Sequence, residues 1–298
     1  MNSRVKGSSL ESKRYEFAIL VDSCCDVPEE YLEKYPIYVI PLRINYKEVS
    51  YRDRIDISPK EIYEKLKLEI PTTSLPQYDD AQEVFENIIK DGYNKIIVIN
   101  ISSNLSGTFN LIRLVSGEFK LKGIQIYQFD TKNIAIGSGM YAISVANHLE
   151  EGKSYEETIS LLKCEYGNSK VFFCAETLEY LSKGGRIGRV SSLIGAALGI
   201  KPIITCGEDG TYCIAGKERG SMRCVRKALM LAKEFASRGK KADIMIMHSG
   251  TVLELEKIKD RLEQLIPNCR VRIGGQISPV LGVHVGPGLI GIAVYLLA

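Results

Sequence analysis

Phe17-Ala18-Ile19-Leu20-Val21 is an unbroken apolar run, and the polar loop Asp22-Ser23-Cys24-Cys25-Asp26 follows it directly. Five apolar residues without polar alternation are typical of a strand buried on both faces, as in a parallel sheet. Further strands are predicted at Lys95–Ile101, which is rich in β-branched residues, and at Ile124–Phe129. Helix start signals separate the runs, among them the capping box Ser58-Pro59-Lys60-Glu61. Alternating strands and helices predict an α/β fold whose first domain is built on a parallel sheet.

The second half of the chain carries a different signal. Ile203–Cys206 and Thr211–Ile214 flank Gly207-Glu208-Asp209-Gly210, a pattern that predicts a β-hairpin. Antiparallel pairing therefore enters, and we expect a C-terminal α/β domain with a mixed or antiparallel sheet. The boundary is expected near Tyr166, with an N-terminal domain over residues 15–166 and a C-terminal domain over residues 167–298.

Composition narrows the class of protein. The 298 residues carry a net charge of only +3, so the charge gives no reason to expect binding to nucleic acid. The eight cysteines form no Cys-x-x-Cys pair, and only three histidines are present, so we expect reduced thiols in a cytoplasmic protein and no metal site. Residues 1–14 are polar and are expected to form a disordered leader. The apolar stretch Leu289–Ala298 is too short to span a bilayer and predicts a buried strand.

Four loops rich in small hydroxyl residues follow predicted strands or precede predicted helices. They are residues 22–26, 72–76, 102–108 and 131–132. Loops at the carboxyl ends of parallel strands meet in one crevice, where ligands usually bind. Hydroxyls and helix N-terminal N–H groups suit an anionic oxygen ligand. Caps and turns favour the same residue types, so each loop taken alone is more typical of local structure than of a ligand site. Several such loops together favour a binding crevice but do not identify its ligand.

The glycine-rich stretch Gly282-Val283-His284-Val285-Gly286-Pro287-Gly288 predicts a loop at a small-molecule site. It lacks the Gly-Lys-Ser/Thr ending of a phosphate-binding loop. A second stretch, Gly184-Gly185-Arg186-Ile187-Gly188, lacks the preceding strand of a dinucleotide fingerprint. We therefore expect no cofactor.

Taken in order, these motifs resemble the DegV family, bacterial fatty acid-binding proteins that serve a fatty acid kinase. The resemblance runs from about Tyr15 to the C-terminus. It rests on a set of motifs in fixed order, namely Val21-Asp22-Ser23, Thr73-Ser74-x-Pro76, Ser102-Ser103-x-Leu105-Ser106-Gly107-Thr108, Thr177-Leu178-Glu179-Tyr180-Leu181-x-x-Gly184-Gly185-Arg186-Ile187, Ile200-Lys201-Pro202 and Gly282-x-His284-x-Gly286-Pro287-Gly288. Two positions depart from the family pattern, because Leu75 replaces a glutamine and Cys24 follows Ser23.

The resemblance implies two α/β domains, with a long-chain fatty acid whose carboxyl group lies near their interface. It implies that Thr73, Ser106 and His284 contact the carboxyl group. The other residues that it implies for the ligand site are Ser74, Ser103, Gly107, Thr108 and Gly286. Arg186 and Arg219 lie where the family carries arginines associated with the partner kinase. The protein would present the acid for acyl-phosphate formation, feeding phospholipid synthesis, and would catalyse nothing itself.

Elementary physical chemistry agrees with a fatty acid ligand. Two hydroxyls and an imidazole can supply three hydrogen bonds to a carboxyl group, and protonated His284 would strengthen its bond. At about 0.8 kcal/mol per buried CH₂ group, an acyl tail contributes on the order of 10 kcal/mol before association costs. We expect Leu193–Ile200 and Val171-Phe172-Phe173 to line the tail. Basic residues around Arg186 and Arg219 are equally typical of a kinase-docking face and of solvated helix faces.

Two other functions use the same residues. A serine hydrolase would need Ser106, His284 and an aspartate such as Asp22. Asn104 stands where the Gly-x-Ser-x-Gly elbow requires its first glycine, which favours the carrier. A lipid-sensing regulator would share the pocket and differ only in its partner.

Overall fold

The computed structural model describes residues 15–193, 199–250 and 255–297. The expected leader and most of the tail segment Leu193–Ile200 lie outside the described residues. Within the described part, the strands are β1 (Ala18–Asp22), β2 (Ile37–Ile40), β3 (Arg43–Asn45), β4 (Ser50–Arg52), β5 (Thr72–Ser74), β6 (Lys95–Asn100), β7 (Gln125–Asp130), β8 (Ser169–Cys174), β9 (Ile200–Cys206), β10 (Tyr212–Arg219), β11 (Lys241–His248), β12 (Cys269–Gln276) and β13 (Ile290–Leu297). The α-helices are α1 (Glu29–Lys34), α2 (Pro59–Lys65), α3 (Tyr78–Lys90), α4 (Thr108–Leu121), α5 (Ile136–Glu150), α6 (Tyr155–Cys164), α7 (Glu179–Lys183), α8 (Ser221–Ala236), α9 (Leu255–Leu265) and α10 (Pro279–Val285).

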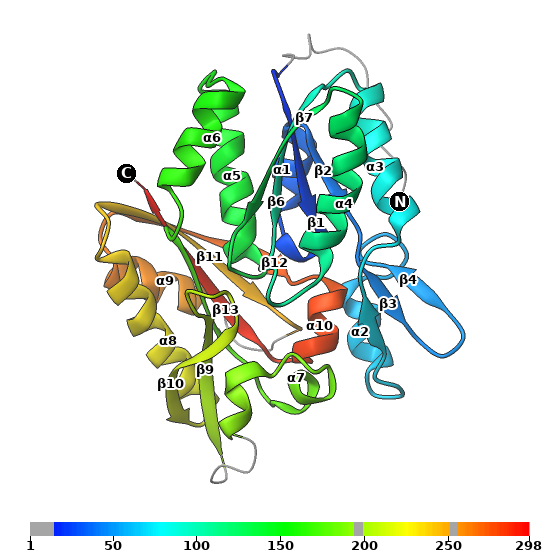
Figure 1. Cartoon of the computed structure of the whole chain (residues 1–298). Coiled ribbons are helices and arrows are strands. Elements are labelled where there is room, and N and C mark those ends of the chain that lie inside the picture. The colour runs from blue at the N-terminus through cyan, green and yellow to red at the C-terminus, as the bar shows by residue number, and fades with distance from the viewer. Residues whose placement is uncertain (1–14, 194–198, 251–254, 298) are drawn as a thin grey trace.

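The first half contains the predicted parallel sheet, in the order β2-β1-β6-β7. Every residue of β1 is buried, because α3 and α4 cover one face of the sheet and α5 and α6 cover the other (Figure 1). The capping boxes at Ser58 and Ser154 begin α2 and α6 as their sequences predict. Burial on both faces explains why the two central strands, β1 and β6, read as largely continuous apolar runs.

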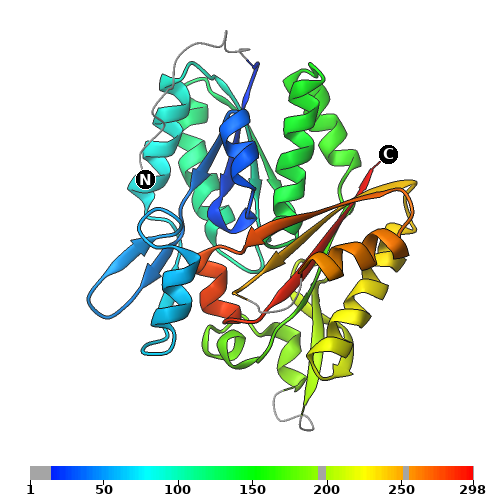
Figure 2. The same ribbon diagram turned by 180° about the vertical axis from the view of Figure 1, so that it is seen from behind.

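The second half contains a six-stranded sheet in the order β10-β9-β8-β13-β11-β12. Its β9–β10 hairpin is antiparallel, with Cys206 opposite Tyr212, as predicted. Only the β11–β12 pair is parallel among the described strands of this sheet. Helices α8 and α9 cover its outer face (Figure 2). The two-sheet α/β architecture expected from the sequence is therefore confirmed.

Helix α5 lies between the two large sheets. It contacts β1 and β6 on one side and β8 and β13 on the other. Nearly all its residues are buried, from Ile136 to Leu149, which is the pattern of a helix that is apolar all round. One continuous hydrophobic core therefore joins both halves of the chain.

Two local features differ from the sequence-based expectation. Strands β3, β4 and β5 form a small antiparallel sheet that the sequence did not predict. Three-residue strands are too short to show a period-2 pattern. The predicted loop Gly282–Gly288 is wrong over its first four residues, which form the end of α10. Glycine allows close packing within this helix, because a Cβ atom on Gly282 would lie only 3.1 Å from side-chain atoms of Ile62 and Tyr63.

No helix in the described part of the chain combines the length and apolarity needed to cross a membrane.

Candidate functional site

A small cavity of about 40 Å³ lies where the two halves of the chain meet. Its polar lining residues are Thr73, Ser74, Ser106, Arg186 and His284. Its apolar lining includes Cys24, Leu42, Ile134, Tyr212, Val280 and Leu281. Three of the four hydroxyl-rich loops thus meet here, as expected. The fourth, Thr131–Lys132, lines a different and wider cleft of about 660 Å³.

His284 and Thr73 are in direct contact in this cavity. Thr73 lies on β5 and His284 on α10, and Oγ1 and Nε2 are 2.8 Å apart. Burial, with a smaller effect from the Arg186 guanidinium, lowers the pKa of His284 to about 4. The imidazole is therefore neutral at pH 7, and the protonated form considered from the sequence is not the resting form of this site. A neutral ring donates one N–H and accepts at its other nitrogen.

Gly184 determines how close the histidine can approach the segment after α7. A Cβ atom on Gly184 would lie 2.3 Å from His284 Nδ1, far inside van der Waals contact. This nitrogen is buried and has no hydrogen-bond partner among the described residues. The glycine in the Gly184-Gly185-Arg186 motif therefore accommodates the imidazole.

Ser106 and Thr108 form the second hydroxyl group of the site. Their Oγ and Oγ1 atoms are 2.8 Å apart, and Ser106 Oγ also accepts from the Thr108 backbone N–H. Thr108 is buried behind Ser106 and begins α4, with Gly107 as the N-cap residue. The Leu75 side chain covers Gly107 at 3.4 Å from its virtual Cβ position. Leu75 thus places an apolar side chain at the rim of the cavity.

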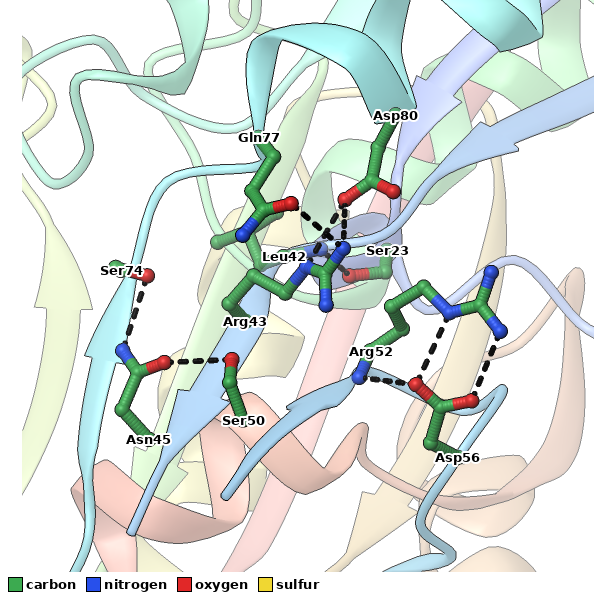
Figure 3. A network of polar contacts seen from close by, with 10 residues as sticks. All are labelled: Ser23, Leu42, Arg43, Asn45, Ser50, Arg52, Asp56, Ser74, Gln77 and Asp80. Carbon is green, nitrogen blue, oxygen red and sulfur yellow. Dashed lines mark hydrogen bonds and ion pairs between the residues drawn. The ribbon is translucent and has the colours of Figure 1, made fainter. Parts of the chain in front are cut away.

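Three further predicted residues lie close by but are engaged elsewhere. The Ser74 hydroxyl accepts a 3.0 Å hydrogen bond from Asn45, which itself accepts from Ser50 (Figure 3). Ser103 Oγ accepts from Lys132 Nζ at 3.0 Å. Gly286 ends α10 with φ of 68°. A Cβ atom at this position would lie 2.3 Å from the Tyr180 ring, so Gly286 shapes the chain path rather than the cavity wall.

The two predicted arginines are separated by the structure. Arg186 lines the cavity, and its Nη1 donates to the Gly184 carbonyl at 2.8 Å. Arg219 ends β10, is exposed and lies beside Gly199. Only Arg186 is in place to act on a group bound beside His284.

A second cavity, of about 30 Å³, lies next to the first and is almost entirely apolar. Ile134, Tyr212 and Leu281 line both cavities. The remaining lining residues are Ala135, Ile136, Val171, Phe173, Met247, Ile277, Val285, Leu289 and Gly291. Among the residues expected to line a tail, Val171 and Phe173 thus lie here. Phe172 does not, because it points to the opposite face of β8 and packs in the cluster under α8.

Sequence reasoning missed the residues shared by the two cavities. Tyr212 was predicted only as a hairpin strand residue, and Leu281 directly precedes the glycine-rich motif. No local signal marks Ile134, which follows the Thr131–Lys132 loop. Their common property is a position at the junction of the two halves.

The contacts of a serine hydrolase are not formed among these described residues. Ser106 is bonded to Thr108 and His284 to Thr73. The Asp22 carboxylate accepts instead from Asn100 and from the backbone of Ile101 and Cys24, at 3.0 to 3.1 Å. No nucleophile–base–aspartate relay therefore connects the residues that the hydrolase hypothesis requires.

Comparison with known proteins agrees with this architecture. Residues 16–297 match the DegV family, described as a family of uncharacterised proteins. A DegV domain-containing protein of Clostridium acetobutylicum is 40% identical over 280 residues, covering 94% of this chain and 99% of the relative. The solved structure of DegV, a fatty acid binding protein from Bacillus subtilis, is 28% identical and superposes with a TM-score of 0.84, covering 95% and 100% of the two chains. A stearic acid-binding protein from Eubacterium ventriosum is 26% identical with a TM-score of 0.85, covering 94% and 98%. This chain belongs to the DegV family.

Proposed function

We propose that this protein binds a long-chain fatty acid, with the carboxyl group in the polar-ended cavity and the acyl chain in the apolar one. The observation that carries the proposal is the adjacency of the two cavities, which share Ile134, Tyr212 and Leu281. Polar groups at one end and apolar walls at the other match an amphiphile with a single polar head.

The head site suits a carboxyl group. Thr73, Ser106 and neutral His284 offer hydroxyl and N–H donors, and Arg186 supplies a nearby positive charge. Hydrogen bonds of this kind stabilise by about 1 kcal/mol each, and more when one partner is charged. They orient the ligand, while the tail supplies most of the binding energy.

Both cavities are narrow, so an acyl chain requires the shared side chains to move apart. Rotation of Tyr212 and Leu281 away from Ile134 would join the two cavities into one channel. A long tail then gains about 0.8 kcal/mol per buried CH₂, part of which offsets the cost of this rearrangement. The solved relative that binds stearic acid supports the same ligand class.

Native mass spectrometry of the purified protein, followed by lipid extraction, tests the proposal. We expect one bound acid of acyl-chain mass, or stoichiometric uptake of added octadecanoic acid. Several preparations with neither bound lipid nor uptake would refute it.

We further propose that the protein works in the cytoplasm as a carrier for a fatty acid kinase, which phosphorylates the bound carboxyl group for phospholipid synthesis. Arg186 at the head cavity supports this step, because a cation beside the carboxyl group would also stabilise an acyl phosphate. An ATP-dependent fatty acid kinase assay tests it. Acyl phosphate should form only when the loaded carrier is present, and formation at the same rate without the carrier would exclude the role.

A further inference from the structure

We propose that Asp26 and Asp53 are positioning residues for the carboxyl site, because they hold the helix that carries His284. The inference rests on the proposed fatty acid function and extends it to two residues that lie outside the cavity.

Helix α10 belongs to the C-terminal half by its position in the sequence, but it packs against the N-terminal half. It connects β12 to β13, two strands of the six-stranded sheet. It nevertheless packs against α2, β3 and β5 of the N-terminal half, and Figures 1 and 2 show it between α7 and α2. The position of His284 relative to Thr73 therefore depends on the contact between α10 and the N-terminal half.

Two carboxylates from the N-terminal half accept the first backbone N–H groups of this helix. Ser278 N donates to Asp26 Oδ1 at 2.8 Å, and Val280 N donates to Asp53 Oδ1 at 3.1 Å. Leu281 N donates to the Ser278 hydroxyl at 3.4 Å, and Pro279 has no N–H. The donors that a helix start leaves unpaired are thus satisfied largely from the other half.

Both carboxyl groups are buried, and two residues of this cluster have unfavourable backbone angles. Their exposed fractions are 3% for Asp26 and 1% for Asp53, and burying a carboxylate is expensive unless it is paired. Arg54 Nη2 pairs with Asp26 Oδ1 at 2.8 Å and also donates to the Gln276 carbonyl at 3.1 Å. Asp26 and Arg54 have φ of 51° and 61°, a region that non-glycine residues seldom occupy. This cluster therefore forms a specific connection between the halves.

The connection reaches the head site through a short helix. α10 has seven residues, and Val280 and His284 are spaced one turn apart on the same face. A displacement of the first turn of α10 therefore also displaces the His284 imidazole. Because Thr73 belongs to the N-terminal half, such a shift changes the Oγ1–Nε2 separation.

Binding measurements on the full chain test the proposal. Asp53→Ala and Asp26→Ala should each weaken binding of cis-parinaric acid by about tenfold, equivalent to about 1.4 kcal/mol. Asp53→Asn keeps an acceptor oxygen and should restore most of the affinity. Asp243→Ala is the matched control, since Asp243 is a buried carboxylate paired with Arg270 and Arg272 away from the cavity. Wild-type affinity in both alanine variants would overturn the proposal.

Imidazole NMR separates this inference from the proposed function. The chain has only three histidines, so their ring signals can be assigned by single substitutions. Without any ligand, Asp53→Ala should shift the His284 signals and leave those of His148 in place, while Asp243→Ala should leave His284 unchanged. Unchanged His284 signals in Asp53→Ala would refute the positioning role. If wild type binds no fatty acid but these shifts occur, the proposed ligand is wrong and the positioning role stands.

Discussion

Thr73 Oγ1 and His284 Nε2 lie 2.8 Å apart although 211 positions separate the two residues in the chain. The pair spans the junction of the two halves, so it forms only when the whole fold is assembled. It joins two of the three residues, Thr73, Ser106 and His284, that the family resemblance implies for the carboxyl group.

Thr73→Val removes the hydroxyl and keeps the side-chain shape. We expect it to weaken fatty acid binding about tenfold, because a donor to the carboxyl group is lost and the His284 ring loses its partner. Thr73→Ser keeps the hydroxyl and should bind close to wild type. Isothermal titration calorimetry with octadecanoic acid measures both, and equal affinities for the two variants would remove Thr73 from the site.

Gly184→Ala should impair binding without preventing folding. Its φ of −75° suits alanine, but the new methyl group would lie 2.3 Å from His284 Nδ1 and displace the ring. Gly117→Ala is the control, since nothing lies within 4 Å of a Cβ atom there and the residue is inside helix α4. The control should be neutral or stabilising by up to about 1 kcal/mol. A Gly184→Ala protein with wild-type affinity and wild-type histidine NMR signals would contradict the close packing.

Gly291→Leu should shorten the acyl chain that the protein accepts. A Cβ atom at Gly291 meets only ordinary contacts, at 3.6 Å from Leu289 and 3.9 Å from Phe173, so Gly291→Ala should fold and bind normally. The longer leucine side chain would occupy the apolar cavity that Gly291 lines. Mass spectrometry of acids extracted from the two variants measures the effect. The same chain-length distribution in both would place the tail elsewhere.

The stability of the protein should fall as the pH rises from about 4 to about 7. Burial raises the pKa of Asp22 to about 6 and of Asp53 to about 7, from an ordinary value of 3.8. In this window the unfolded chain has lost these protons while the folded protein keeps them, so deprotonation favours unfolding. His284 acts in the opposite direction between its lowered pKa of about 4 and the ordinary histidine pKa of 6.5.

Asp53→Asn isolates one of these contributions. Its free energy of unfolding relative to wild type should increase by up to about 4 kcal/mol between pH 4 and pH 8. Urea denaturation across this range measures the difference. A difference that is constant with pH would show that Asp53 titrates normally in the folded protein.

The protein should not hydrolyse p-nitrophenyl acyl esters above the background rate. Ser106 is bonded to Thr108, and the His284 ring to Thr73, so neither forms the activated pair of a hydrolase. Turnover that Ser106→Ala abolishes at unchanged thermal stability would establish catalysis instead.

The sequence predicted well the strands that are buried on both faces of the sheet. It was less informative where the two faces of a strand have different surroundings. β1 and β6 could be predicted because both faces are covered, which leaves a continuous apolar run. The same property hides the direction of each side chain. Phe172 and Phe173 are adjacent in β8 and both buried, so no alternation shows that only Phe173 faces the apolar cavity.

The contacts of α10 could not be predicted for a different reason. Ser278 and Pro279 are ordinary helix-start signals, but Gly282 disfavours a helix in the sequence. Only the structure shows that a glycine here allows close packing against Tyr63. The roles of Asp26 and Asp53 depend on atoms that lie more than two hundred positions away in the chain. Such contacts leave no periodic pattern in the sequence.

The place of β13 bears on how the protein is made. This strand follows all the other described strands along the sequence but lies between β8 and β11 inside its sheet. The parallel sheet, by contrast, is complete once Asp130 has been synthesised. A ribosome can therefore release a finished first sheet early. Strands β8, β9 and β10 can pair with one another, but the other edge of β8 stays open until β13 has been synthesised. That open edge is the part of the nascent chain for which we expect chaperones to matter most.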